Sequence, residues 1–221
     1  MNNEQRLEEA RCLVVTSVEA EREAVRLGIG ESARFRVMVG GVGQAAVAAA
    51  TAAELSKGSY ELVVNMGIGG GFREAAEIGT VVVASEIVAA DLGAESKDGF
   101  ILIDELGFGS ARMATEAAIS KRIVEAVQAR GITVAYAPVL TVTTVTGTAE
   151  TAQLLASRIP GAAAEAMEGY GAAAAAKLMQ VPVIEIRGIS NAVGPRDRDA
   201  WRIKDALLAL EAAAAALKEV I

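Results

Sequence analysis

Six short runs of apolar residues, most of them rich in valine and isoleucine, recur along the chain and restrict the folds open to it. The runs lie at residues 12–16, 35–39, 61–66, 80–84, 138–145 and 181–186. Strands covered by helices on both faces carry few polar residues, because neither face meets water. The runs therefore predict buried strands of a parallel sheet.

Helical patterns separate several of these runs, at residues 43–56, 112–130, 161–179 and 202–219. Alternation of strands and helices predicts a three-layer α/β/α fold around a mostly parallel mixed sheet. The 221 residues contain no internal repeat and no linker. We therefore expect a single domain over residues 1–221.

Charge and residue content exclude several classes of function. The net charge is −7 without a compact basic block, which argues against nucleic-acid binding. The absence of histidine removes Ser-His-Asp and Cys-His catalysis and the usual ligands of a transition-metal site. No apolar run reaches the roughly 18 residues of a membrane span, and the polar, acidic N-terminus is unlike a signal peptide. The single cysteine, Cys12, allows no internal disulfide, so we expect a cytoplasmic protein.

Glycine-rich stretches follow two of the predicted strands. They read "VGGVGQ" at residues 39–44 and "NMGIGGGF" at residues 65–72. Ligands of α/β folds bind beyond the carboxyl ends of the strands, and glycine lets backbone N–H groups approach them. A turn without a ligand explains the first stretch equally well. Repetition of the pattern favours a ligand-contacting role.

Carboxylates and one amide stand at further candidate positions. Glu19 and Glu21 follow the first strand, where they either complement the dipole of a starting helix or supply a general base. Glu165 and Glu168, expected one helical turn apart, lie in an apolar segment and should be paired or bind something polar. Ser190-Asn191 follows the last strand, where a turn is the ordinary explanation.

Taken in chain order, these stretches resemble the nucleoside phosphorylase/nucleosidase superfamily over about residues 12–219. The resemblance rests on E-x-E after the first strand, then "GGVGQAA", "NMGIGGG", "EAMEG" and "IRGISNAVG". Within the superfamily, "RGISNAVGPRDRDAW" is most similar to the futalosine hydrolases.

The resemblance implies roles in cleaving a purine N-glycosidic bond. Glu21 matches the glutamate that deprotonates the attacking water. Glu168, preceded by Met167, matches the glutamate that accepts hydrogen bonds from the 2′ and 3′ hydroxyls of the ribose. The remaining matching positions lie near the ribose (Gly41 and Gly43) or along the base (Gly69, Gly70, Val145 and Thr146).

Asn191 departs from the adenine-releasing members, which carry aspartate at the matching position. A carboxamide can donate from its NH₂ to a 6-oxo group and accept from a protonated N7. Asn191 therefore indicates hypoxanthine rather than adenine as the leaving base. It cannot itself supply a proton at neutral pH, so the proton source stays open.

The first loop bears on the choice between water and phosphate as nucleophile. Phosphorylases of this fold carry a phosphate-binding arginine there, whereas this chain reads "SVEAEREA", whose glutamates would repel phosphate. Hydrolysis is therefore favoured, although Arg22 and Arg73 leave phosphorolysis open.

Futalosine also carries a benzoate on its 5′ extension. Arg196 and Arg198 could pair with this carboxylate, and Trp201 could pack on the ring. A solvated charge run that opens the last helix at Asp199 explains the segment equally well.

The sequence thus predicts a nucleosidase that hydrolyses futalosine to hypoxanthine and the dehypoxanthinyl sugar. We expect no metal or organic cofactor and no nucleic-acid or membrane partner. We also expect a homo-oligomer, because small superfamily members often complete their pockets with a neighbouring subunit. An adenine-releasing methylthioadenosine/S-adenosylhomocysteine nucleosidase, a 6-oxopurine phosphorylase and a catalytically silent nucleoside-binding protein are the alternatives.

Overall fold

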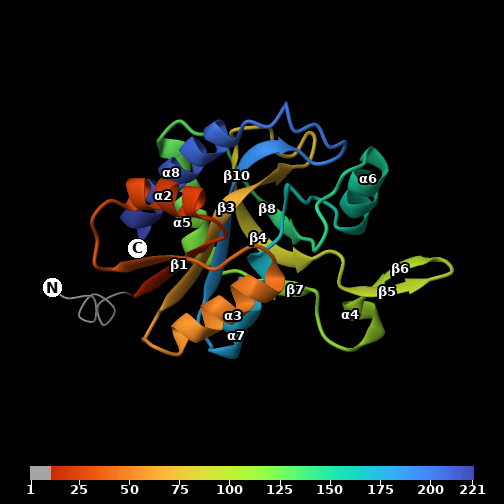
Figure 1. Cartoon of the computed structure of the whole chain (residues 1–221), viewed down its shortest axis with the longest axis horizontal. Helices are drawn as coiled ribbons and strands as arrows, with labels where there is room; N and C mark the ends of the chain where they lie inside the picture. Colours follow the sequence, from red (N-terminus) through yellow and green to blue (C-terminus); the bar gives the residue numbers. More distant parts are fainter. Residues whose placement is uncertain (1–10) are drawn as a thin grey trace.

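An eight-stranded mixed sheet forms the centre of the computed structural model, which describes residues 11–221 (Figure 1). Its strands are β1 (Cys12–Thr16), β2 (Phe35–Val39), β3 (Leu62–Gly71), β4 (Val81–Ala89), β7 (Arg112–Ala114), β8 (Val134–Thr141), β9 (Ala164–Ala166) and β10 (Val183–Ala192). A separate hairpin joins β5 (Gly93–Ser96) to β6 (Gly99–Leu102).

Most strand pairs of the sheet are parallel. β1 lies between β2 and β3, β3 pairs with β10, and β8 pairs with β4 and β9, all in parallel. The pairs β10–β4, β3–β9 and β4–β7 are antiparallel. Because β3 contacts both β10 and β9, the strands β3, β10, β4, β8 and β9 close into a ring. This closure brings three strands together at the carboxyl end of β3.

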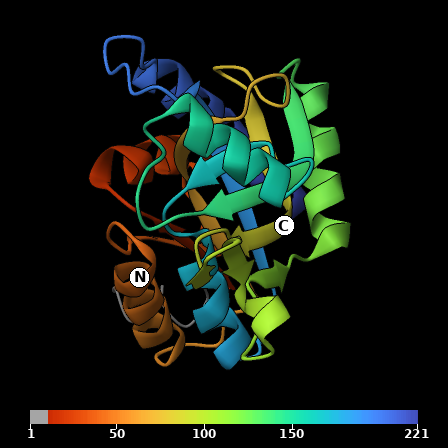
Figure 2. The same ribbon diagram turned by 90° about the vertical axis from the view of Figure 1, so that its right-hand side faces the viewer.

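Helices cover both faces of the sheet, as Figures 1 and 2 show. One face carries α2 (Glu19–Ile29), α5 (Ala117–Ala129) and α8 (Ile203–Val220), and the other carries α3 (Gln44–Leu55) and α7 (Gly169–Leu178). α6 (Ala149–Arg158) follows β8, and the short α4 (Ile103–Leu106) follows the hairpin. The predicted three-layer α/β/α class is confirmed. No helix among residues 11–221 is long and apolar enough to cross a membrane.

Two apolar cores explain why the predicted strands carry so few polar residues. Alternate residues of β1 enter different cores, with Val14 packed under α2 and α8 and Val15 under α3 and α7. Such alternation is what a strand covered on both sides requires.

The predicted strands and helices are correct in kind, but several boundaries were wrong. The glycine stretch at 67–71 and the Ser190-Asn191 pair belong to β3 and β10 rather than following them. The predicted strand at 138–145 ends at Thr141, and the predicted helix at 112–130 begins as β7. Strand pairing extends β3 and β10 because their neighbours supply hydrogen-bond partners that local propensity does not reveal.

The predicted helix at 161–179 was also wrong in its first part. Residues Ala164–Ala166 form β9, and α7 starts only at Gly169. Glu165 and Glu168 are therefore not one helical turn apart, since Glu165 lies on a strand and Glu168 is the N-cap of α7. The last helix begins at Ile203 instead of at Asp199.

Candidate active site

The carboxylate of Glu21 is buried in the first turn of α2, where backbone N–H groups hold both of its oxygens. Oε2 accepts from the N–H of Ser17 at 2.8 Å and from that of Val18 at 3.2 Å. Oε1 accepts from the N–H of Ile68 on β3 at 2.9 Å. The side chain thus ties α2 to the central strand, and its position is fixed by three donors.

The carboxylate of Glu168 lies at the start of α7 and reaches toward the glycine loop before α3. Its Oε1 accepts from the N–H of Gly43 at 3.1 Å. Its Oε2 accepts from the N–H of Met167 at 3.3 Å and pairs with Nη1 of Arg187 at 3.4 Å. The side chains of this ion pair are only 6% and 0% exposed. A buried pair of this kind is costly unless its hydrogen-bonding groups are satisfied.

Glu21 and Arg187 approach the same glycine of β3. A methyl group on Gly67 would lie 2.6 Å from Nη1 of Arg187 and 2.8 Å from Oε1 of Glu21. Glycine at this position therefore leaves the space into which both groups point. Burial alone would lower the pKa of Arg187, but the surrounding carboxylates outweigh burial and raise it. The guanidinium is thus a permanent charge beside the two carboxylates.

Further along β3, Asn191 and Glu165 flank Gly70. Gly70 pairs with Asn191 of β10 on one side and with Glu165 of β9 on the other. Oδ1 of Asn191 accepts from the hydroxyl of Ser190 at 2.8 Å, and its Nδ2 donates to the carbonyl of Ala192 at 3.0 Å. The amide orientation is therefore set by two local contacts, with the NH₂ group on the side of Gly70.

Glu165 anchors the loop that follows β8. Its Oε1 accepts from the N–H of Thr146 at 2.9 Å, and its Oε2 accepts from the Thr146 hydroxyl. Burial raises the pKa of Glu165, and these two bonds act in the opposite direction. Val145, next in the loop, is 37% exposed. Thr146, which is predicted to contact the base, is thus anchored to β9, whose Glu165 pairs with Gly70 opposite Asn191.

The segment between β10 and α8 returns to this edge. The N–H of Arg196 donates to the carbonyl of Gly147, and the N–H of Arg202 donates to that of Ser190. The guanidinium carbons of Arg196 and Arg198 lie 5.5 and 6.0 Å from the centre of the Trp201 ring. Such distances are typical of cation–π contacts. The two exposed arginines therefore form one cluster with the half-buried tryptophan near the site.

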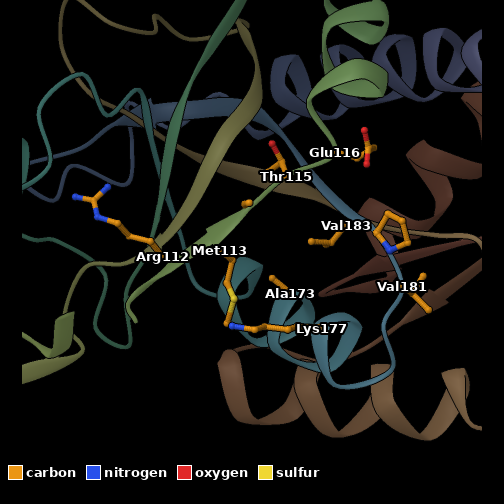
Figure 3. Close-up of a pocket in the computed structure, with 10 residues that line it drawn as sticks. Arg112, Met113, Thr115, Glu116, Ala173, Lys177, Val181 and Val183 are labelled. Atoms are coloured by element: carbon orange, nitrogen blue, oxygen red, sulfur yellow. The ribbon is translucent and has the colours of Figure 1, made fainter. Parts of the chain in front are cut away.

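Two cavities lie in different parts of the described chain. The larger, about 520 Å³, is lined by side chains from β7, α7 and the start of β10, including Arg112 and Lys177 (Figure 3). It lies near Val183, roughly 25 Å along the extended strand from Asn191. The smaller, about 300 Å³, lies between α6, Phe72 and Arg73 after β3, and Val193 after β10. Glu21, Glu168, Glu165 and Asn191 line neither cavity, but the smaller one lies near Asn191, because Val193 follows two residues later on the same segment.

The structure places most of the predicted residues in two neighbouring groups. The first combines Glu21, Glu168 and the glycine loop, and the second combines Asn191, Gly70 and Thr146. The backbone of β3 joins them, because Ile68 contacts the first group and Gly70 the second. Gly69 lies between these contacts, and Gly41 adjoins the glycine loop.

Sequence reasoning missed Arg187 and Asn65. The side chain of Asn65 accepts from Nη2 of Arg187 and donates to the carbonyl of Val15 at 3.0 Å. A signal was available, because Glu185 and Arg187 are charged residues at alternate positions of an apolar strand, and both are 0% exposed. Arg22, left open as a phosphate partner, pairs with Glu19 and Glu23.

Comparison with known proteins agrees with this fold and identifies the family. The family model of the phosphorylase superfamily matches residues 6–221. The protein is 46% identical to futalosine hydrolase of Streptomyces coelicolor, over 95% of both chains. It is 44% identical to futalosine hydrolase of Acidothermus cellulolyticus, over 93% of this chain and 89% of the relative. Among solved structures, futalosine hydrolase of Helicobacter pylori shares its fold with a TM-score of 0.83 at 14% identity, covering 96% and 99% of the two chains.

Because the family model covers nearly the whole chain, the protein belongs to the phosphorylase superfamily. Structural likeness reaches across the superfamily. A methylthioadenosine/S-adenosylhomocysteine nucleosidase of Neisseria meningitidis has a TM-score of 0.80 at 18% identity, covering 94% and 98% of the chains. Sequence identity is more selective, and it assigns the chain to the futalosine hydrolase family.

Proposed function

We propose that the protein hydrolyses the N-glycosidic bond of futalosine and releases hypoxanthine and dehypoxanthine futalosine. The observation that carries this proposal is the convergence of Glu21 and Arg187 on Gly67, with Glu168 joined to the same guanidinium. Glu21 and Arg187 can together bind one water molecule, and Glu168 can bind the hydroxyls of one ribose. Identity above 40% to two futalosine hydrolases supports the same substrate.

Glu21 acts as the base for water in this proposal. The C1′–N9 bond breaks with its electron pair moving to the purine, while the water oxygen bonds to C1′ and one water proton passes to Glu21. The hypoxanthine anion takes up a proton from solvent water, and Glu21 returns its proton to solvent. Three backbone N–H groups already hold the carboxylate, so little reorganisation accompanies the reaction. A nearby Nη1 of Arg187 can donate to the same water and orient its lone pair.

Glu168 binds the ribose. A carboxylate can accept hydrogen bonds from two neighbouring hydroxyls, and its negative charge favours the ribosyl cation that develops as the base departs. The N–H of Gly43 and the guanidinium of Arg187 fix its two oxygens from opposite directions. Met167 lies directly before it, and Gly41 borders the same loop. Glu168, which we call the ribose clamp, is therefore held in position before the substrate binds.

Asn191 recognises the base by hydrogen bonding in this scheme. Its NH₂ group lies on the side of Gly70 and can donate to the 6-oxo group of hypoxanthine, which a carboxylate would repel. Gly69, Val145 and Thr146 lie along the base. We further propose that Arg196, Arg198 and Trp201 receive the benzoate tail, because the two arginines of their cluster are exposed and Arg196 contacts the loop after β8.

Water rather than phosphate is the nucleophile. Beside Glu21, the only arginine in the first turn of α2 is Arg22, whose side chain already pairs with Glu19 and Glu23. A phosphate would also meet the charges of Glu21 and Glu168 at close range. The scheme requires no metal and no organic cofactor.

We also propose a single domain that forms homo-oligomers in the cytoplasm. The family match over residues 6–221 supports one domain. Phe108 and Leu178, which are 83% and 75% exposed, are apolar side chains that association between subunits could cover. A buried lone cysteine, Cys12, is consistent with a reducing compartment.

Release of hypoxanthine from futalosine, followed by chromatography with and without phosphate, tests the proposed reaction. Equal rates in both buffers, with the free sugar as second product, are expected. A rate that rises with phosphate, or a sugar 1-phosphate product, would assign the protein to the phosphorylases instead.

A further inference from the structure

Glu185 is a wholly buried carboxylate that the reaction scheme does not use. It lies on β10, two residues before Arg187, so both side chains point to the same face of the sheet. Its Oε1 accepts from Nε of Arg187 at 2.8 Å, and both side chains are 0% exposed. Its Oε2 has no hydrogen-bond partner among residues 11–221. A buried carboxylate with one oxygen unpaired is costly, so this group calls for an explanation beyond its single bond to Arg187.

Arg187 is held on three sides, and Glu185 provides one of them. Nε bonds to Glu185, Nη1 pairs with Glu168, and Nη2 donates to Asn65. These contacts leave the guanidinium plane with little freedom to rotate. Without Glu185, the Nε edge would lose its partner, and Nη1 would no longer be fixed between Glu168 and Gly67.

The start of α7 is shaped to admit this carboxylate. A methyl group on Gly169 would overlap the carboxylate of Glu185. Because Gly169 follows Glu168 directly, the space for Glu185 and the position of the ribose clamp are set by the same turn. The contact is a second observation, independent of the bond to Arg187, that links Glu185 to the site.

The charge of Glu185 also matters for the reaction. A ribosyl cation forms beside Arg187, and the guanidinium charge opposes it at short range. Around Arg187 stand Glu185 of the same strand, Glu168 at the start of α7 and Glu21 of α2. In the proposed reaction Glu21 binds the water and Glu168 binds the ribose. Glu185 is therefore the remaining carboxylate, and its negative charge offsets the positive charge of the guanidinium. Burial raises the pKa of Glu185, while Arg187 acts to lower it.

We propose that Glu185 is a positioning residue, which fixes the guanidinium of Arg187 and cancels its charge next to the developing ribosyl cation. This inference rests on the proposed function. It predicts that Glu185 affects the catalytic step and the pH dependence of the reaction, without contacting the substrate.

Glu185→Gln tests the proposal, because glutamine keeps an oxygen for Nε of Arg187 and removes only the charge. With futalosine as substrate, kcat should fall by about 10- to 100-fold, as expected for one uncompensated charge in a buried site. KM should stay within about threefold, since no substrate contact is lost. The acid limb of the pH profile of kcat/KM should move to lower pH, because loss of one negative charge favours the ionised form of the carboxylates that remain around Arg187.

Glu54→Gln is a matched control. Glu54 is also buried and paired with cations, Arg36 and Lys57, but it lies on α3 and contacts none of the site residues. Its replacement should leave kcat and the acid limb unchanged. Glu185→Asp keeps the charge and should lower kcat less than Glu185→Gln, with the acid limb in its wild-type position.

A Glu185→Gln protein with wild-type kcat and an unmoved acid limb would overturn the proposal. So would a loss confined to KM. Should the glutamine variant fail to fold, Glu185→Asp decides: reduced kcat with an unmoved limb supports the proposal, and unchanged kcat contradicts it. Wild-type protein that leaves futalosine intact would instead refute the proposed function itself.

Discussion

Replacing Glu21 by glutamine tests the water base with the smallest change of shape. The amide oxygen can serve the N–H groups of Ser17 and Val18, but the NH₂ group then faces the N–H of Ile68. One buried donor loses its acceptor, which costs about 1–3 kcal/mol of unfolding free energy. The melting temperature should fall by about 2–12 °C for a chain of this size. Loss of a general base should lower kcat by about 10²- to 10⁴-fold.

The assay compares turnover of futalosine, binding of futalosine and thermal unfolding for the wild type and the variant. Glu19→Gln is the control, because Glu19 is on the same helical turn but has a 62% exposed side chain paired with Arg22. Its loss should cost at most about 1 kcal/mol and leave kcat unchanged. The reasoning fails if Glu21→Gln keeps kcat within tenfold of the wild type, or if binding and turnover fall equally.

Three further predictions concern the base, the tail and the core. Asn191→Asp should slow hypoxanthine release from futalosine at least about tenfold and increase adenine release from methylthioadenosine, because the new carboxylate repels a 6-oxo group. Both reactions would be followed by chromatography, and an unchanged preference between the two substrates would mean that the amide does not recognise the base. Trp201→Ala should raise KM for futalosine several-fold and leave the inhibition constant of hypoxanthine unaltered, whereas equal changes in both would argue against a tail contact. Burial raises the pKa of Cys12 from 9.0 to about 12. The protonated thiol therefore contributes to the free energy of unfolding fully below pH 9, and this contribution, up to about 4 kcal/mol, is lost as the pH rises toward 12. Urea unfolding between pH 8 and 11 should therefore show a shallower decline for Cys12→Ala than for the wild type, and parallel declines would rule this out.

The fold class could be predicted because each buried strand shows its burial in its own residues. β1 and β2 were placed to the residue, since β1 is a run of mostly apolar residues between Arg11 and Ser17, and β2 is apolar apart from Arg36. β9 could not be found this way. Its three residues pair with β3 and β8 inside an alanine-rich stretch that locally favours helix. The closure of the sheet, which depends on β9, is therefore a tertiary property.

The candidate site was predicted in part for a related reason. Glu21, Glu168 and Asn191 follow or end strands, where chain order and the family resemblance both draw attention to them. Arg187 lies inside β10, where strand residues ordinarily serve the core, and its ion pair depends on a residue 19 positions earlier. Strand pairing decides which residues lie in the same closed ring of strands. No local sequence pattern shows that pairing.

The most direct test of the account is separate incubation of the protein with futalosine, with inosine and with methylthioadenosine, each with and without phosphate, resolved by chromatography. Hypoxanthine released from futalosine at the same rate in both buffers, with methylthioadenosine left intact, is the predicted result. Adenine from methylthioadenosine in preference to hypoxanthine from futalosine would contradict the role of Asn191. Release that requires phosphate would contradict the role of Glu21.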